Sequence, residues 1–246
     1  MSKKTKHWSI PKGKRIFDIT VASLLLITIM PLLLLVAICI KIESRGPVFY
    51  TSKRVGQGFR VFDFYKFRSM RPNASAMLQE IRHLNQYNTV NQAVDAKGYD
   101  LIELIKDDEQ IPESIYQIEK AKKGSQIFIK VQNDPRVTRV GKIIRNTSID
   151  ELPQLWNVIK GDMSLVGNRP LPLYEAELLT DDESILRFKA PAGITGLWQV
   201  EARGKKKVSD QERKKYDVIY SQEYNWIMDL RILAKTLPAA LQEADV

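Results

Sequence analysis

An uninterrupted apolar run at residues 19–40 constrains this chain more than any other feature, because its 22 residues include no charged side chain. At a rise of about 1.5 Å per residue, a straight helix of that length would cross the hydrocarbon core of a bilayer. A signal peptide is disfavoured, since the run is long and lacks a small-residue cleavage site. Hydropathy alone therefore predicts one transmembrane helix.

The middle and the flanks of this run favour a different path through the membrane. Pro31 lies near its middle, where it removes one helical hydrogen bond and tends to bend the axis. Basic residues flank the run on both sides, with six between Lys3 and Arg15 and two more at Lys41 and Arg45. By the positive-inside rule, both ends prefer the cytoplasm. A bent, re-entrant helix that enters one leaflet and returns would satisfy both observations.

Charge and composition narrow the class of protein further. The formal net charge is +9, and the basic N-terminus suits either anionic lipid headgroups or nucleic acid. Because the apolar run follows directly, we expect membrane lipids and no nucleic acid as a partner. A single cysteine, Cys39, and two histidines, His7 and His83, exclude a disulfide framework and disfavour a histidine general base. Catalysis would then depend on carboxylates, lysines and arginines.

Residues 145–170 gather the groups that such catalysis needs. Asp150 and Glu151 are adjacent, Asp162 follows, and Arg145 and Arg169 bracket the stretch. Two neighbouring carboxylates can share a divalent cation, or one can attack while the other binds metal or moves a proton. Two guanidinium groups can neutralise a diphosphate through forked hydrogen bonds. The pattern therefore predicts phosphoryl transfer.

The same residues have a purely structural interpretation. Ser148 and Glu151 fit a helix capping box, and acids in a first turn suit the helix dipole. If Asp150 were the N-cap, Pro153 would occupy the third helical position, where no intrahelical N–H is missed. A short capping motif alone is more often a helix start than a catalytic site.

A longer series of motifs distinguishes between these interpretations. In chain order the motifs are KRIFD (14–18), GPVFY (46–50), KFRSM (66–70), NDPRVTRVGKIIR (133–145), SIDELPQLWNVIKGDMSLVG (148–167), RP (169–170) and PAGITGLWQV (191–200). This order resembles the bacterial sugar transferases that load polyprenyl phosphate, also called monotopic phosphoglycosyl transferases. Since no apolar run precedes the first motif, the resemblance is to the short form of that family.

The resemblance implies an α+β fold: a mostly helical cytoplasmic catalytic domain with short strands, anchored by an N-terminal re-entrant membrane helix. We expect residues 1–45 to form the basic N-terminus and membrane helix, and residues 46–246 to form the catalytic domain. Residues 71–127 match no motif and are expected to be a variable insertion or lid. The family breaks its membrane helix at a Ser-Pro pair. Here Met30 replaces the serine, and the Thr28 hydroxyl is a candidate to bind the freed carbonyls.

The activity implied is transfer of a sugar phosphate from a UDP-sugar to undecaprenyl phosphate, with release of UMP, at the cytoplasmic face of the inner membrane. It would be the first membrane step of surface glycan synthesis. Asp150 would form a covalent aspartyl phosphosugar, and Glu151 would act as metal ligand or base. Mg²⁺ would be held by Asp150 and Glu151. Oligomeric state stays open, with a homodimer as one alternative, and a non-catalytic, basic, lipid-binding membrane anchor is the alternative function.

Several further side chains are expected to contact substrate: Lys66, Arg68, Arg145, Asp162, Arg169, Gln199 and Arg203. For Lys66 and Arg68, a solvated strand end is the alternative. Two departures from the family pattern lie close to this set. Directly before Arg169 the family usually has proline, where this chain has Asn168. Directly before Arg203 the family usually has glycine, where this chain has Ala202.

Local patterns also predict secondary structure. Aromatic alternation predicts a strand at 61–67, and apolar residues at helical spacing predict a helix from residue 226 to residue 237, facing either the core or the membrane interface. The other expected strands are 46–50, 127–131 and 197–200, the last after a turn at 193–196. The other expected helices are 74–87, 99–106, 115–122, 137–145, 174–188 and 209–224.

Overall fold

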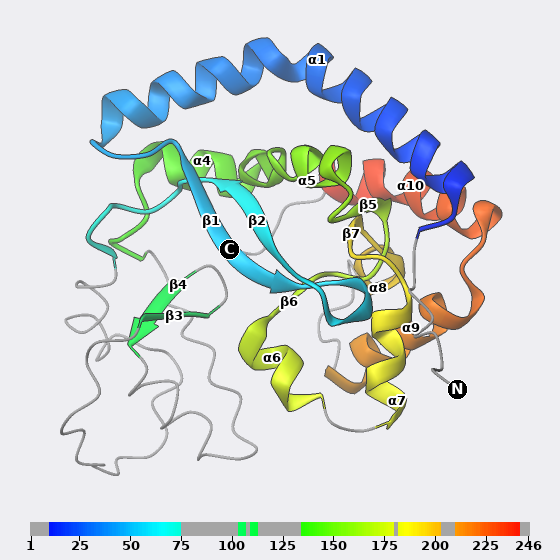
Figure 1. Ribbon diagram of the computed structural model, residues 1–246. Helices are drawn as coiled ribbons and strands as arrows, with labels where there is room; N and C mark the ends of the chain where they lie inside the picture. Colours follow the sequence, from blue (N-terminus) through cyan, green and yellow to red (C-terminus); the bar gives the residue numbers. More distant parts are fainter. Residues whose placement is uncertain are drawn as a thin grey trace, which may run out of the picture.

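The longest element of the computed structural model is the N-terminal helix α1 (Lys12–Glu43), which contains Pro31. The structure describes residues 10–74, 103–106, 109–112, 134–179, 182–202 and 210–241. Figure 1 shows α1 as one continuous helix that bends as it passes above the rest of the chain. Within the described ranges, α1 alone is long and apolar enough to cross a membrane. The Thr28 hydroxyl donates to the carbonyl of Leu24, and not to the carbonyl of Ile27 that Pro31 deprives of its donor.

The first turns of α1 are fixed to the domain by buried polar contacts. The Lys14 ammonium lies 2.5 Å from a carboxylate oxygen of Asp229, and both side chains are buried. The Arg15 guanidinium donates to the carbonyls of Val158 and Ile159, which end a short helix of the domain. Cations are favourable at a helix C-terminus because the last carbonyls lack intrahelical donors. This end of α1 is therefore held on two other helices.

The last turn of α1 is fixed to the same domain in the complementary way. The Glu43 carboxylate accepts hydrogen bonds from the backbone N–H groups of Arg139 at 2.7 Å and Val140 at 2.9 Å. These donors belong to the first turn of another helix, at residues 139–146, where orphan N–H groups favour an anion. Val36 and Ile40 bury their side chains nearby. The middle of α1 is different, because several of its large side chains, Ile27 at 70% among them, are exposed.

Two small sheets form the centre of the domain. Strands β1 (Phe49–Val55) and β2 (Val61–Phe67) pair in antiparallel register from Phe49 with Phe67 to Val55 with Val61, and β6 (Leu171–Pro172) pairs with the other side of β1. Strands β5 (Ser164–Val166) and β7 (Gly193–Thr195) form a parallel pair. A separate hairpin joins β3 (Glu103–Lys106) and β4 (Glu109–Pro112).

Short helices surround these sheets. They are α4 (Arg139–Asn146), η3 (Ile149–Glu151), α5 (Gln154–Lys160), α6 (Leu173–Leu178), α7 (Asp182–Ile185), η4 (Leu186–Lys189), α8 (Leu197–Ala202), α9 (Asp210–Glu223) and α10 (Trp226–Leu241), with η1 (Gln57–Phe59) in the β1–β2 turn. The main core joins α1 to the inward side of β2, to α5 and to α10 through Ala22, Phe64, Val158 and Ile232. In Figure 1, α4 and α5 follow one another beneath α1.

The structure confirms the mixture of helices and short strands. The strand at 61–67 is confirmed, and the helices expected at 137–145 and 209–224 are α4 and α9. The strand expected at 46–50 begins only at Phe49 and continues to Val55. The helix expected at 174–188 is divided into α6, α7 and η4, and helix α10 both contributes to the core and exposes Trp226 at 47%.

Three local predictions are wrong. Residues 103–106 form β3 where a helix was expected over 99–106, residues 193–195 form β7 where a turn was expected, and residues 197–200 begin α8 where a strand was expected. The turn was predicted at 193–196 because of its two glycines, which have a different role in the structure. A Cβ at Gly193 would lie 2.1 Å from the Gly167 nitrogen, so glycine permits close pairing of β7 with the chain after β5. The predictions for 75–87, 115–122 and 127–131 lie outside the described residues.

Candidate active site

Asp150 and Glu151 lie on a single 3-10 turn, η3, between α4 and α5. Ser148 precedes them with φ +55°, in the left-handed region, which costs a non-glycine residue roughly 1–2 kcal/mol. Its side chain makes no capping hydrogen bond, and the N-cap of α5 is Pro153. The capping-box interpretation is therefore wrong, and so is Asp150 as an N-cap. Strained backbone of this kind is concentrated at functional sites.

Glu151 of the carboxylate pair contacts the end of β2. Glu151 Oε1 lies 3.2 Å from the Lys66 ammonium, with the Glu151 side chain 31% exposed and that of Lys66 9% exposed. Asp150 is buried. Lys66 also lies 5.6 Å from the centre of the Phe64 ring. A buried cation is thus held against Glu151 from the facing sheet, and substrate contact by Lys66 stays a prediction.

Arg145 lies in the last turn of α4, shortly before the strained Ser148. Its Nε donates to Ser69 Oγ at 2.7 Å, and the Ser148 N–H donates to its carbonyl at 3.0 Å. Close packing of α4 on the chain after β2 makes this contact feasible. A Cβ at Gly141 would lie 1.9 Å from the Ser69 carbonyl oxygen, so only glycine fits there. One edge of the guanidinium is thereby oriented.

Arg68 faces the end of α1. Its guanidinium donates to the carbonyls of Ser44 at 2.8 Å and Arg45 at 3.2 Å and to the Ser44 hydroxyl at 2.7 Å. Burial lowers the pKa of Arg68. These contacts satisfy carbonyls at the C-terminus of the membrane helix. Substrate contact by Arg68 stays a prediction.

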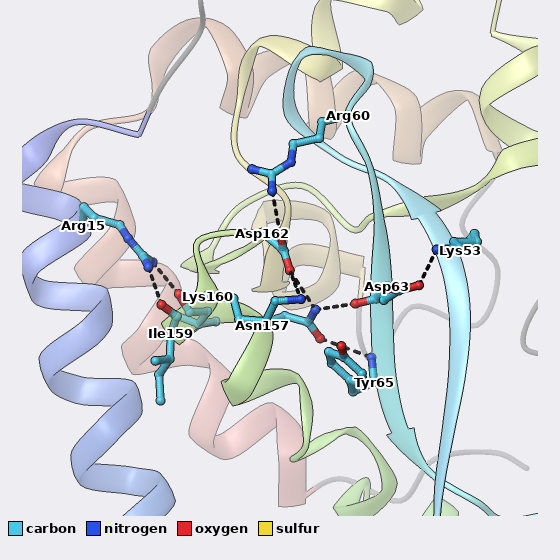
Figure 2. Close-up of polar contacts among 10 residues, drawn as sticks. Arg15, Lys53, Arg60, Asp63, Tyr65, Asn157, Ile159, Lys160 and Asp162 are labelled. Atoms are coloured by element: carbon cyan, nitrogen blue, oxygen red, sulfur yellow. Dashed lines mark hydrogen bonds and ion pairs between the residues drawn. The ribbon is translucent and has the colours of Figure 1, made fainter.

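Asp162 lies beyond the far end of α5, which covers about 10 Å at 1.5 Å per residue. Figure 2 shows its carboxylate between the guanidinium of Arg60, at 3.1 Å, and the amide of Asn157, at 3.4 Å. Lys160 Nζ is 3.2 Å from Asp162 Oδ2, the oxygen that Asn157 also approaches, and this hydrogen bond raises the pKa of Lys160. Asn157 in turn accepts from the Tyr65 N–H at 3.2 Å. Asp162 therefore ties α5 to the β1–β2 hairpin, and its substrate role stays a prediction.

Arg169 and Gln199 follow the two strands of the second sheet, β5 and β7. Arg169 is exposed after β5, two residues before β6. Gln199, on α8, donates to the carbonyl of Ile194 at 3.1 Å, while its buried Oε1 has no hydrogen-bond partner within the described chain. A Cβ at Gly196 would lie 2.2 Å from the Gly167 oxygen and 3.0 Å from Gln199 Oε1, so the Gln199 amide lies beside the chain that leads to Arg169. Arg203 lies outside the described residues.

One buried cation was missed by the sequence interpretation. Arg54 is 2% exposed and lies 5.4 Å from the centre of the Phe64 ring, on the inward face of β1. Arg54 pairs with Pro172 in the β1–β6 register, and Pro172 is close in sequence to Arg169. The signal was the alternation of Ser52 and Arg54, which becomes visible only when the strand is extended to Val55.

Asp150 and Glu151 suit a metal ion whose remaining coordination positions are filled by substrate. Among the described residues, no group of three or more His, Cys, Asp or Glu side chains could hold a metal ion. Asp150 and Glu151 supply two adjacent carboxylates. Mg²⁺ is commonly bound through one or two carboxylates together with substrate phosphates and water. The pair therefore fits Mg²⁺ brought together with a diphosphate.

Comparison with known proteins identifies related chains over almost the whole length. The family model of the bacterial sugar transferases matches residues 10–243. The chain is 35% identical, over 92% of its length, to the exopolysaccharide production protein ExoY of Rhizobium meliloti (strain 1021), of which it covers 84%.

Relatives named for a reaction are similarly close. The chain is 36% identical over 93% of its length to the undecaprenyl-phosphate galactose phosphotransferase of Salmonella typhimurium, and covers 40% of that protein. It is 34% identical over 93% of its length to the UDP-glucose:undecaprenyl-phosphate glucose-1-phosphate transferase of Caulobacter vibrioides, and covers 69% of it.

Proposed function

Because the chain belongs to the bacterial sugar transferase family, we propose that it transfers a sugar phosphate from a UDP-sugar to undecaprenyl phosphate and releases UMP. The observation that carries the proposal is the Asp150–Glu151 pair on a strained turn, held against the buried Lys66. The reaction names of two relatives, one for a galactose and one for a glucose phosphate, support this substrate class. The reaction would begin the assembly of a surface glycan.

In the first step, a carboxylate oxygen of Asp150 attacks the phosphorus that carries the sugar. An Asp150–phosphorus bond forms, the bond from that phosphorus to the bridging oxygen breaks, and UMP departs with the electron pair. The buried position of Asp150 keeps bulk water from the aspartyl phosphosugar. In the second step, an oxygen of undecaprenyl phosphate attacks the same phosphorus and Asp150 leaves as carboxylate, so that one nucleophile serves two substrates in turn.

The remaining groups would offset the negative charge of the carboxylates and of the substrate phosphates. Lys66 fixes the Glu151 carboxylate, and Arg145, held by Ser69, presents the rest of its guanidinium to the phosphates. Arg169 supplies the second forked donor. Asp150 and Glu151 would hold Mg²⁺, which would supply positive charge to stabilise the departing phosphate. Glu151 would act as metal ligand or as a base, and either role would use the orientation that Lys66 imposes.

The position of α1 supports a re-entrant arrangement. Arg15 at its start and Glu43 at its end are both bonded to the same domain, while the bent middle exposes apolar side chains. A domain of polar surface cannot lie on two sides of a bilayer at once, so both ends of α1 belong to one side. With basic residues at both ends, that side is the cytoplasmic face of the inner membrane.

The alternative, a non-catalytic lipid-binding anchor, lacks support from the site, because the turn that carries Asp150 does not begin a helix in the way capping requires. The test is UMP release by the purified full-length chain from a panel of UDP-sugars, with undecaprenyl phosphate and Mg²⁺. We expect release with at least one donor and loss of release in Asp150→Asn. No release with any donor would favour the anchor.

A further inference from the structure

The asparagine that replaces the family's proline before Arg169 is the centre of a buried polar cluster. Asn168 Nδ2 lies 2.9 Å from the carbonyl oxygens of both Arg187 and Asp217 and 2.8 Å from the Ser221 hydroxyl. Asn168, Arg187, Asp217 and Ser221 are each buried to more than nine-tenths. These partners come from η4 and α9, so the cluster connects the chain after β5 to two helices that are distant in sequence.

The backbone of residue 168 is fixed as well. Its N–H donates to the Pro191 carbonyl at 2.9 Å, and its carbonyl accepts from the Gly193 N–H at 2.8 Å, in a parallel bridge that extends the β5–β7 pair. A proline at this position would lack the N–H and so could not make the first bond. The chain therefore uses hydrogen bonds at a position where the family uses a ring with fixed φ.

The next peptide is held by a buried ion pair. Arg187 Nη2 donates to the carbonyl of Arg169 at 3.0 Å and to the Asp217 carboxylate at 2.5 Å, and Arg187 Nε lies 3.1 Å from the same carboxylate oxygen. Burial raises the pKa of Asp217, and the charges of Arg187 and Arg169 oppose that rise. The Arg169 side chain is thus close enough to interact with Asp217, although Arg169 itself is exposed.

We propose that Asn168, Arg187, Asp217 and Ser221 are positioning residues that orient Arg169 toward the donor diphosphate. Asn168 fixes the peptide before Arg169, Arg187 fixes the Arg169 carbonyl, and Asp217 attracts the Arg169 guanidinium while it neutralises Arg187. In this role the four side chains replace the rigidity that a proline would supply. The inference rests on the proposed function, because it needs Arg169 to bind a phosphate.

A double-mutant cycle tests whether the cluster acts through Arg169. Asn168→Ala removes the amide that lies among these three oxygens, and we expect kcat/KM for the UDP-sugar to fall about tenfold, the size of a modest loss of orientation. In an Arg169→Lys background, the same substitution should lower kcat/KM by less than about twofold, because the forked donor it orients is already absent. Ser221→Ala is a milder second variant, with a smaller loss and the same coupling.

The control is Thr236→Val on α10, which removes a half-buried hydroxyl 2.8 Å from Thr195 Oγ1 of β7, a hydrogen bond that does not involve the four residues of the cluster. Its effect on kcat/KM should be the same in both backgrounds, and thermal unfolding of each variant measures the structural cost separately. Equal losses from Asn168→Ala and Ser221→Ala with and without Arg169 would overturn the positioning role while the activity stands. If the wild-type chain releases no UMP from any donor, the proposed function fails and this inference fails with it.

Discussion

Replacing Lys66 by methionine should reduce activity while the fold survives. The substitution keeps the length and apolar stem of a buried side chain and removes only the ammonium, 3.2 Å from Glu151 Oε1. At that distance two unit charges attract by about 5 kcal/mol with an effective dielectric constant near 20. Since Glu151 is 31% exposed, water offsets much of this, and about 1–2 kcal/mol should be lost from the free energy of unfolding.

The kinetic effect should be larger than this stability loss suggests. Lys66 constrains the orientation of Glu151 beside Asp150, and without it we expect kcat/KM to fall roughly 10- to 100-fold, equivalent to a charged hydrogen bond of about 1.5–3 kcal/mol. The assay is UMP release at varied UDP-sugar concentration, with a pre-steady-state measurement of the burst that precedes addition of lipid phosphate.

Lys53→Met is the matched control. Lys53 lies on the neighbouring strand and pairs with Asp63 at 2.6 Å, as Figure 2 shows, but both side chains are exposed, at 54% and 40%. An exposed pair contributes roughly 0–1 kcal/mol, so its removal should leave kcat/KM unchanged. If Lys66→Met stays within about threefold of the wild type in kcat/KM, Lys66 does not organise the catalytic pair, and the argument built on its contact with Glu151 is refuted.

Three further results are expected. Asp150→Asn should fold and insert normally but lose the burst of about one UMP per active enzyme that the wild type gives without lipid acceptor; a retained burst would transfer the nucleophilic role to Glu151. Arg169→Lys should cost about 1.5–3 kcal/mol of transition-state stabilisation and lower kcat/KM accordingly, because lysine lacks the forked donor. Activity within about twofold of the wild type would remove Arg169 from the site. In a Cys39→Ala background, cysteines placed near Lys4 and Lys53 should react with a membrane-impermeant reagent only from the cytoplasmic side; periplasmic labelling of either would indicate a spanning helix.

The sequence predicted best the elements in which buried and exposed side chains alternate regularly. The aromatic alternation of 61–67 specified β2 in full, since each inward position is filled by Phe62, Phe64 or Lys66. The stretch from Gly193 to Val200 was assigned incorrectly because its structure depends on a distant partner. Gly193 and Gly196 are small to admit Gly167, a contact that no local pattern reveals.

The candidate residues could be chosen from the sequence, but their geometry could not. The adjacent acids, Lys66 and Arg145 were chosen from the order of motifs, and their roles stay predictions. The structure shows that Glu151 contacts Lys66 of β2 and that Arg145 contacts Ser69 in the chain after it. The left-handed conformation of Ser148 was not predictable, because the same letters fit a capping box. The cluster around Asn168 was also hidden, since its partners follow it by 19 to 53 residues.

The contacts that hold the two ends of α1 to the domain have a consequence for how a lipid substrate would reach the site. A helix bonded through Arg15 at one end and Glu43 at the other is held to the domain at two separated points, which restrict tilting between them. In the proposed re-entrant arrangement, the catalytic turn would therefore keep a nearly constant height above the headgroups, and the proposed lipid acceptor would reach it by lateral diffusion in two dimensions. Glu43→Gln would weaken one of these contacts without touching the catalytic residues. It should slow the lipid-dependent half-reaction more than the release of the first UMP, a difference measurable by comparing the two steps in vesicles.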